Sequence, residues 1–226
     1  MKFSEGAKVV VVEDHAMFRE ILTKVCAEEL GLRVVAEVSD GESAIAAIRT
    51  HRPELVVLDL QLPDFDGFAV VGAVAEEIPA AAVLVVSSHC DDYTVYRAEQ
   101  LRVRGFVDKN SNSLQALRAA IRALGVGQSW FSETYTRAKA ARHRDPRAFD
   151  KLLTRREQDV LALLCVPLTD PEIALRLGVS VETAAKHRFN LMRKLSADTT
   201  TALIRYAREH GFGLSGSANA GPRARP

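Results

Sequence analysis

The sequence predicts an α/β domain with a doubly wound, five-stranded parallel sheet, followed by a small all-α domain of four helices. Within residues 8–124, five short apolar runs alternate with amphipathic helical patterns, which is the order typical of a parallel α/β fold. From residue 153 onward only helical periodicity is present. A length of 226 residues is sufficient for two modest domains, each with its own core. We expect domains at 1–126 and 152–213, a linker at 127–151 and a disordered tail at 214–226.

Charge is divided unequally between the two halves of the chain. Residues 1–128 contain 13 Lys and Arg against 19 Asp and Glu, whereas residues 129–226 contain 17 against 10. The formal net charge of +1 therefore combines an acidic half with a basic half, and a basic domain is typical of proteins that bind nucleic acid. The hydrophobic content of 47% and the charged content of 26% are ordinary for globular proteins and argue against wholesale disorder.

The central element of the first domain is the segment 55–60, which is apolar except for Asp59 and lies between Pro53 and Pro63. An apolar run of this length predicts a strand that is buried on both faces. Asp59 then lies at the carboxyl end of the strand, where open α/β sheets bind their ligands. Considered alone, Asp59 is equally compatible with a carboxylate that caps the following turn.

The other elements of this domain follow in order along the chain. Further apolar runs predict strands at 8–12, 33–38, 82–87 and 105–108. Amphipathic patterns predict helices at about 15–30, at 41–50, in a segment that ends before Pro79, at 91–102 and at 114–124. Gly31 and Gly125 end the first and the last of these helices.

Polar side chains with reactive groups follow four of the predicted strands. They are Glu13 and Asp14 after the first strand, Asp59 in the third, Ser87 at the end of the fourth and Lys109 beyond the fifth. Because the carboxyl ends of parallel strands open on one edge of a sheet, we expect these side chains to lie close together. Each has an ordinary structural explanation as a cap, a turn residue or a solvated lysine, but their coincidence at four strand ends favours a site.

The residue types at this edge indicate phosphoryl chemistry. Three adjacent carboxylates repel one another and require a cation, and oxygen ligands of this kind suit Mg²⁺. A divalent ion together with a lysine ammonium and a serine hydroxyl can neutralise and hydrogen-bond a phosphoryl group. A carboxylate can itself act as the nucleophile and form an acyl phosphate. Asp59, on the central strand, is the best placed of the three to accept it.

These motifs resemble the receiver domain of bacterial response regulators, which has a flavodoxin-like fold. The matching stretches within residues 8–124 are Val-Val-Glu13-Asp14, Leu-Asp59-Leu-Gln-Leu-Pro, Val-Val-Ser87-Ser and Gly-Phe106-Val-Asp-Lys109. The resemblance implies that Asp59 is the phosphoacceptor, that Glu13 and Asp14 bind Mg²⁺ with it, and that Lys109 binds the phosphate. It also implies that Ser87 and Phe106 are a hydroxyl and an aromatic switch residue, and that a histidine kinase donates the phosphoryl group.

Two positions depart from the family pattern. Arg102-Val103 stands where the family often has Gly-Ala, and Ser88 stands where a small alanine usually follows the switch hydroxyl. The first change adds bulk and charge on the surface that usually dimerises, and the second narrows access to Asp59. Neither change removes a reactive group, so they bear on rate and dimer geometry rather than on the reaction.

Residues 127–151 are expected to form a linker. Its aromatic pair Trp130-Phe131 is expected to pack onto the last helix of the first domain rather than to stack on a ligand. The stretch 137–147 is basic and has few large apolar residues, which favours a solvated and partly helical segment. Contact of this stretch with phosphates is the less favoured alternative.

The second domain begins with the capping-box pattern Thr154-Arg-Arg-Glu157, which Thr169-Asp-Pro-Glu172 repeats. Two further helices are expected after Ser180 and from Thr199. The two central helices are joined by Leu-Gly-Val-Ser, a helix-turn-helix signature. The helix that follows is basic, with Lys186, His187, Arg188, Arg193 and Lys194. A solvated helix face is often basic as well, but the preceding turn favours DNA binding.

This second domain resembles the LuxR-type DNA-binding domain, and the two domains together are similar to NarL/FixJ-type response regulators. The resemblance implies a transcription regulator whose third C-terminal helix lies in the major groove and whose fourth helix supplies a dimer contact on activation. The positions carried over are Ala185, Lys186 and Phe189 facing the groove, with Thr183, His187, Arg193 and Lys194 near phosphates. Ala184-Ala185 replaces the usual Val-Lys, so a base-reading lysine is missing. We hypothesise that Ala185 and Phe189 contact thymine methyl groups while Lys186 contacts a guanine edge.

Cysteine usage and the N-terminus bear on the compartment. Cys26, Cys90 and Cys165 fit neither a disulfide framework nor a zinc pattern, which favours free thiols in a reducing compartment. Residues 1–8 contain no apolar signal segment, and 9–12 is too short to span a membrane. We expect a cytoplasmic protein with no membrane partner.

Three alternative functions are compatible with parts of the pattern. A Mg²⁺-dependent phosphatase with Asp59 as nucleophile would need a general acid, for which Gln61, Asp64 and Asp66 are near, but the sequence contains no cap domain. A flavin binder is disfavoured because the acidic loop after the first strand would repel a phosphate. A third alternative is a receiver that binds DNA without being phosphorylated, and the complete set of site residues argues against it. The sequence therefore favours a regulator that is not an enzyme.

Overall fold

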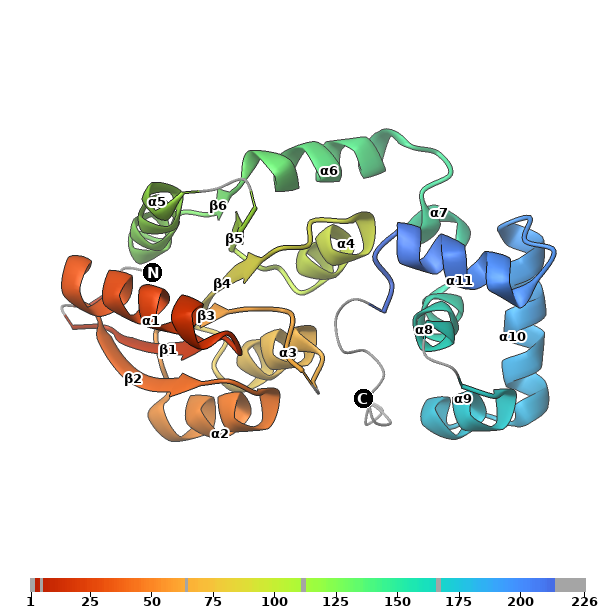
Figure 1. Cartoon of the computed structure of the whole chain (residues 1–226), viewed down its shortest axis with the longest axis horizontal. Coiled ribbons are helices and arrows are strands. Elements are labelled where there is room, and N and C mark those ends of the chain that lie inside the picture. The colour runs from red at the N-terminus through yellow and green to blue at the C-terminus, as the bar shows by residue number, and fades with distance from the viewer. Residues whose placement is uncertain (1–2, 5, 64, 111–112, 166–167, 214–226) are drawn as a thin grey trace.

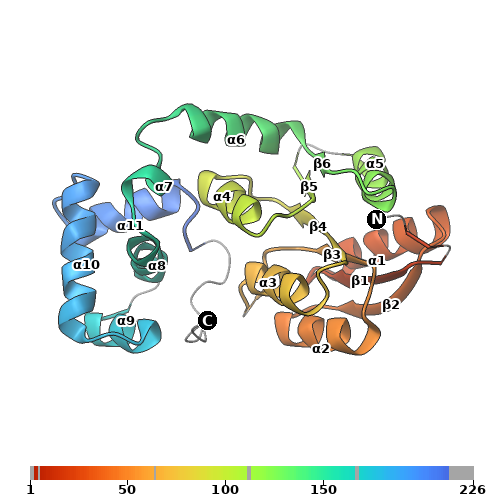
Figure 2. The ribbon, with the colours of Figure 1, turned by 180° about the vertical axis from the view of Figure 1, so that it is seen from behind.

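A computed structural model describes residues 3–4, 6–63, 65–110, 113–165 and 168–213. The sheet domain and the helical domain lie at opposite ends of an elongated molecule and are bridged by α6 (Glu133–Arg144), as Figure 1 shows. Figure 2 shows the same arrangement from behind. Within the described ranges, no helix is long and apolar enough to cross a membrane. The tail expected to be disordered lies outside these residues.

The sheet of the first domain is parallel throughout, and its strand order is β2-β1-β3-β4-β5-β6. Its five longer strands are β1 (Lys8–Val12), β2 (Arg33–Val38), β3 (Leu55–Leu58), β4 (Ala82–Ser87) and β5 (Gly105–Asp108). Every residue of β3 is completely buried, as the apolar run predicts, because helices cover both faces of the sheet. The predicted doubly wound domain is confirmed, and β3 lies between β1 and β4 with Asp59 directly after it.

Helices divide between the two faces of the sheet. On one face are α1 (Ala16–Lys24) and α5 (Leu114–Gly125), and on the other are α2 (Gly41–His51), α3 (Gly67–Glu77) and α4 (Asp92–Gln100). The first helix was expected to run unchanged over 15–30. It instead passes after Lys24 into a π-helical turn, in which the Leu30 N–H donates to the Val25 carbonyl at 3.2 Å. The wider turn places both Val25 and Cys26 in the core.

The prediction of five strands was wrong, because the linker contributes a sixth. β6 (Trp130–Phe131) pairs parallel with β5, with Gly105 opposite Trp130 and Phe106 opposite Phe131. Trp130 packs against the same core cluster as α5, as expected, whereas Phe131 packs into the cluster on the other face. A two-residue strand has no periodicity to detect, and its position depends on the aromatic side chains on either face.

The basic part of the linker is largely helical, and most of its basic side chains are exposed, as expected, whereas Arg142 is buried. It lies mainly in α6, whose Tyr135 is 2% exposed, and the chain continues into α7 (Phe149–Leu152). Arg142 is buried between Glu99 of α4 and Asp150 of α7, with its Nη1 atom 2.6 Å from the Asp150 carboxylate. A buried guanidinium is costly unless it is paired, so the ion pair with Glu99 explains why α6 is held against α4, and the ion pair with Asp150 links α6 to α7.

The second domain contains α8 (Arg155–Leu164), α9 (Asp170–Leu177), α10 (Val181–Lys194) and α11 (Thr200–Glu209). Both predicted capping boxes are formed, at Thr154 and at Thr169. Gly178 ends α9 with a φ of +64°, a conformation that glycine adopts without steric cost, and thereby makes the turn into α10. The predicted helix-turn-helix is therefore present.

The two domains share a packed interface between α4, α7 and the segment after α11. Tyr93 stacks on Phe212 with 4.1 Å between ring centroids, and Phe149 lies 5.0 Å from Phe212. The Tyr93 N–H donates to the His210 carbonyl at 3.0 Å, and His210 Nδ1 lies 3.1 Å from Asp92 Oδ2. Thus α4, which directly follows the loop after β4, contacts the helical domain.

Candidate functional site

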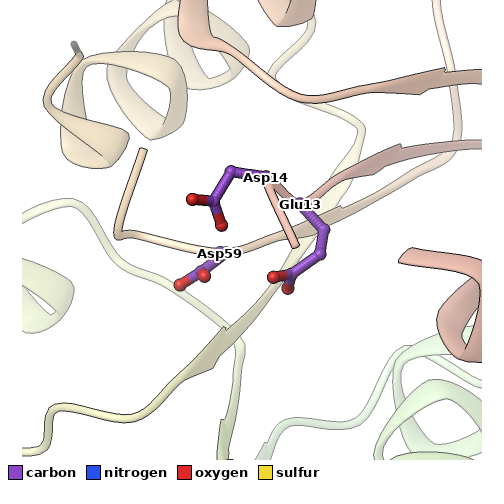
Figure 3. A group of neighbouring side chains, drawn as sticks. All are labelled: Glu13, Asp14 and Asp59. Carbon is purple, nitrogen blue, oxygen red and sulfur yellow. The ribbon is translucent and has the colours of Figure 1, made fainter. Parts of the chain in front are cut away.

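Three carboxylates meet at the carboxyl edge of the sheet, as Figure 3 shows. Glu13 and Asp14 follow β1, and Asp59 follows β3; one oxygen from each lies within 4.8 Å of the others. Backbone hydrogen bonds between neighbouring strands set the positions of Glu13 and Asp59. The Asp59 N–H donates to the Val12 carbonyl at 2.9 Å, and the Glu13 N–H donates to the Val38 carbonyl at 3.0 Å. Glu13 and Asp59 are buried and Asp14 is exposed. The structure therefore brings the three predicted metal ligands together.

Lys109, which directly follows β5, is the fourth charged residue of this cluster. Its Nζ atom lies 2.8 Å from Glu13 Oε2 and 2.7 Å from Asp59 Oδ2. The Lys109 N–H donates to the Ser87 carbonyl at 2.9 Å, which continues the ladder of β4 and β5 and fixes where the lysine leaves the sheet. One ammonium beside three carboxylates leaves an excess of negative charge, which favours a cation at this edge.

The pKa of the Glu13 carboxyl depends on its burial and on its two charged neighbours, Lys109 and Asp59. Burial raises the pKa of Glu13 above its usual value, the hydrogen bond from Lys109 lowers it, and the charge of Asp59 raises it again. The carboxylate–lysine cluster opens to solvent through a pocket that is lined by Asp14, Gln61, Ser88 and Lys109 among others. The three carboxylates provide the hard oxygen ligands that Mg²⁺ prefers. The pocket beside them leaves room for the water molecules that this ion keeps and for a phosphoryl oxygen.

Ser87 and Phe106, the predicted switch residues, lie on the adjacent strands β4 and β5, and neither lines the pocket. Ser87 is completely buried, and its hydroxyl accepts the His89 N–H at 3.2 Å, while Ser88 lines the pocket. The buried Phe106 ring lies 4.9 Å from the ring of Tyr135, which stacks on Phe131 at 4.7 Å. The linker thus covers the predicted aromatic switch residue, a contact that no local pattern indicates.

The loop after β3 bears on the phosphatase alternative. Asp59 Oδ1 accepts the Gln61 N–H at 3.0 Å. Asp66 caps α3 through the Phe68 N–H at 3.0 Å, and it forms a buried ion pair with Arg97 of α4 at 3.2 Å. Asp66 is therefore occupied as a structural group, and Asp64 lies outside the described residues. The Asp66–Arg97 pair also ties the loop after Asp59 to α4.

The basic helix α10 lies along the edge of the second domain that faces away from the sheet domain (Figures 1 and 2). Lys186, Arg193 and Lys194 are exposed, and Phe189 is 67% exposed although it is a large apolar residue. Thr183, Ala185 and His187 are half-buried. Phe189 and Lys186 both lie on α10, and both are accessible to a binding partner.

Two of the basic residues of α10 have acidic partners within the domain. Lys194 Nζ lies 2.7 Å from Glu157 Oε2, and Arg188 Nη2 lies 2.7 Å from Asp170 Oδ2. Although burial raises the pKa of Glu157, hydrogen bonds from Lys194 and Thr154 lower it below its usual value. Lys194 therefore has a structural partner that the sequence prediction of a phosphate contact did not include.

Comparison with known proteins extends these observations. Residues 9–122 match the family model described as the response regulator receiver domain, and residues 151–207 match that of the luxR family of bacterial regulatory proteins. The response regulator protein VraR of Staphylococcus aureus is 28% identical over 205 residues, which cover 91% of this chain and 98% of VraR.

Solved structures show the same fold. RcsB from Salmonella enterica serovar Typhimurium, bound to promoter rprA, has a TM-score of 0.67 at 22% identity, with 89% of this chain and 98% of that chain covered. A two-component response regulator of the LuxR family from an Aurantimonas species is 27% identical, with a TM-score of 0.57 and coverage of 62% and 99%. Both resemblances inferred from the sequence are confirmed.

Proposed function

Since the chain belongs to the two-component response regulators that join a receiver domain to a LuxR-type domain, we propose that phosphorylation of Asp59 controls its DNA binding. The observation that supports this proposal best is the cluster of Glu13, Asp14 and Asp59 with Lys109 at the carboxyl edge of the sheet. The phosphoryl donor would be a phosphohistidine of a cognate kinase. A regulator that acts by binding DNA in this way would work in the cytoplasm.

The chemistry follows from the positions of the charges. An oxygen of Asp59 attacks phosphorus, the bond between phosphorus and the histidine nitrogen breaks, and the ring nitrogen leaves with its electron pair. Glu13, Asp14 and Asp59 would hold Mg²⁺, which when bound neutralises charge on the transferred phosphoryl oxygens. Lys109 is within 2.7 Å of Asp59 Oδ2, so its ammonium can pair with an oxygen of the new phosphoryl group.

The signal has a short route from this edge to the second domain. Ser87 ends β4, and the next helix is α4, whose Tyr93 and Asp92 contact the segment after α11. A phosphoryl group on Asp59 that attracts the Ser87 hydroxyl would move the loop that leads into α4. We expect that movement to weaken the Tyr93–Phe212 contact, because packed interfaces shift between discrete arrangements rather than deform gradually.

The released element would be α11, not α10. The resemblance to LuxR-type domains assigns a dimer contact to α11, and its C-terminal end is the part that α4 contacts. Since α10 already faces outward, phosphorylation would act on DNA binding by permitting dimers, which set two copies of α10 on adjacent half-sites. RcsB has been solved as dimers bound to DNA, and we extend that assembly to this chain as a proposal.

Base reading by α10 would rest on few side chains. Phe189 and Ala185 would contact thymine methyl groups, and Lys186 would donate to a guanine edge. Selection from a randomised DNA pool with wild type and Phe189→Ala tests this assignment. Phe189→Ala should change the preferred sequence; a loss of affinity with an unchanged preference would show that Phe189 does not read bases.

Phosphoacceptance is tested by mass spectrometry after incubation with acetyl phosphate and Mg²⁺. The wild type should gain one phosphoryl group, and Asp59→Asn should gain none. Asp198→Asn is a matched control, because Asp198 is an exposed aspartate in the second domain. A wild type that gains no mass, or an Asp59→Asn variant that gains as much as wild type, would contradict the assignment.

A further inference from the structure

The Lys109 ammonium is held on a third side by an aromatic ring. Its Nζ atom lies 4.6 Å from the centroid of the Phe18 ring, in addition to its contacts with Glu13 and Asp59. Phe18 projects from α1 and lines the same pocket as the three carboxylates. The Lys109 side chain is 13% exposed, so this contact forms in a partly desolvated setting.

An aromatic face supplies something that the carboxylates do not. The π-electrons of the ring attract a cation, and the attraction is greater where water is excluded. A lysine ammonium is otherwise a mobile, strongly hydrated charge on a flexible stem. A divalent ion bound to Glu13 and Asp59 would compete with the Lys109 ammonium for both carboxylates. It would not compete with the ammonium for the face of the Phe18 ring. The ring is therefore the partner that can still hold the ammonium after the ion has bound.

We propose that Phe18 is a positioning residue for phosphoryl transfer, whose ring face keeps the Lys109 ammonium beside Asp59 when Mg²⁺ and the phosphoryl group occupy the carboxylates. This inference rests on the proposed phosphorylation of Asp59. The alternative role for Phe18 is packing alone, since it also packs against the core cluster that contains Leu22. The two roles differ in one respect, because packing depends on the volume of the ring and cation binding depends on its electron density.

Replacement of Phe18 by residues of similar size separates these roles. Phe18→Leu keeps an apolar side chain and removes the aromatic face, whereas Phe18→Tyr keeps the face. We expect Phe18→Leu to reduce the rate of phosphorylation by acetyl phosphate roughly two- to fivefold, and Phe18→Tyr to retain it. Equal rates for wild type and Phe18→Leu would overturn the inference while leaving phosphorylation of Asp59 intact.

Fluorinated phenylalanines at position 18 keep the test decisive if Phe18→Leu does not fold. Each added fluorine withdraws electron density from the ring face and changes the volume little. The logarithm of the phosphorylation rate should fall steadily with the number of fluorines. A flat series would assign Phe18 to packing alone.

A readout without phosphorylation distinguishes failure of this inference from failure of the proposed function. In the NMR spectrum of the full chain with Mg²⁺ present, the ε-methylene protons of Lys109 should be shifted upfield by the Phe18 ring current. Phe18→Leu should abolish that shift. If wild-type protein shows the shift but is not phosphorylated, the proposed function fails and the contact stands; if the shift is absent with Mg²⁺, the positioning role is overturned.

Discussion

Tyr93→Ala is expected to undock the two domains without phosphorylation. The Tyr93 ring is 5% exposed, and its aromatic partners in the second half of the chain are Phe212 at 4.1 Å and Phe149 at 6.0 Å. Each aromatic pair contributes about 0.5–1.5 kcal/mol beyond its buried area. Loss of both pairs should therefore weaken docking by about 1–3 kcal/mol, which corresponds to roughly a 5- to 150-fold smaller docking constant.

Hydrogen–deuterium exchange measures this change directly. The segment 200–213 and the N-terminal turn of α4 should exchange faster in Tyr93→Ala than in wild type, because the Tyr93 N–H donates to the His210 carbonyl across the interface. The core of β3 should be unaffected, which serves as an internal reference. The unphosphorylated variant should also bind target DNA more tightly than unphosphorylated wild type.

Tyr93→Phe is the matched control. It keeps both ring contacts and loses the hydroxyl, which accepts a hydrogen bond from Arg97 Nη1 at 3.0 Å within α4. Its exchange in 200–213 should remain close to that of wild type. If Tyr93→Ala leaves exchange in that segment unchanged, the Tyr93 contacts do not hold the domains together, and the route through α4 is wrong.

Three further predictions concern the metal site, pH and DNA phosphates. Asp14→Ala should lower Mg²⁺ affinity by about tenfold or more in calorimetric titration, since it removes a carboxylate ligand; an unchanged affinity would exclude Asp14 as a ligand. Because the pKa of Glu13 is raised in the folded state, chiefly by burial, this group favours folding below its unfolded-state pKa and loses that contribution as pH rises through the folded-state pKa. Glu13→Gln should therefore gain stability relative to wild type as pH rises above the ordinary glutamate pKa of 4.5 in urea titrations with EDTA, and a difference independent of pH would contradict this sign. Arg193→Ala should reduce the slope of log affinity for DNA against log salt by about one, whereas Lys194→Ala should reduce it less because Glu157 pairs with Lys194; equal reductions would show that this pair opens on DNA.

The sequence predicted the site at the sheet edge because its geometry depends on strand order alone. Runs such as 8–12 and 55–58 predict buried strands of a parallel sheet, and the carboxyl ends of such strands bring Glu13, Asp59 and Lys109 together. Capping patterns at Thr154 and Thr169 likewise located helices correctly, since caps depend on residues three positions apart.

Features that depend on distant partners were not predictable in this way. The charges of Arg142 and Lys139 predict solvent exposure, and only the position of Glu99 on α4 explains why both pair there and why α6 packs against α4. Similarly, nothing near Lys194 in the chain indicates its pairing with Glu157, and nothing near Lys109 indicates the Phe18 ring. These contacts join residues that are far apart in sequence, so no local periodicity records them.

The central claim is that a covalent change at Asp59 controls DNA binding by the second domain. Its most direct test is the affinity of the full chain for a selected DNA site, measured before and after acetyl phosphate and Mg²⁺, for wild type and Asp59→Asn in parallel. Phosphorylated wild type should bind more tightly and with two copies per site, while Asp59→Asn should not respond. Equal affinity of wild type before and after confirmed phosphorylation would contradict the account.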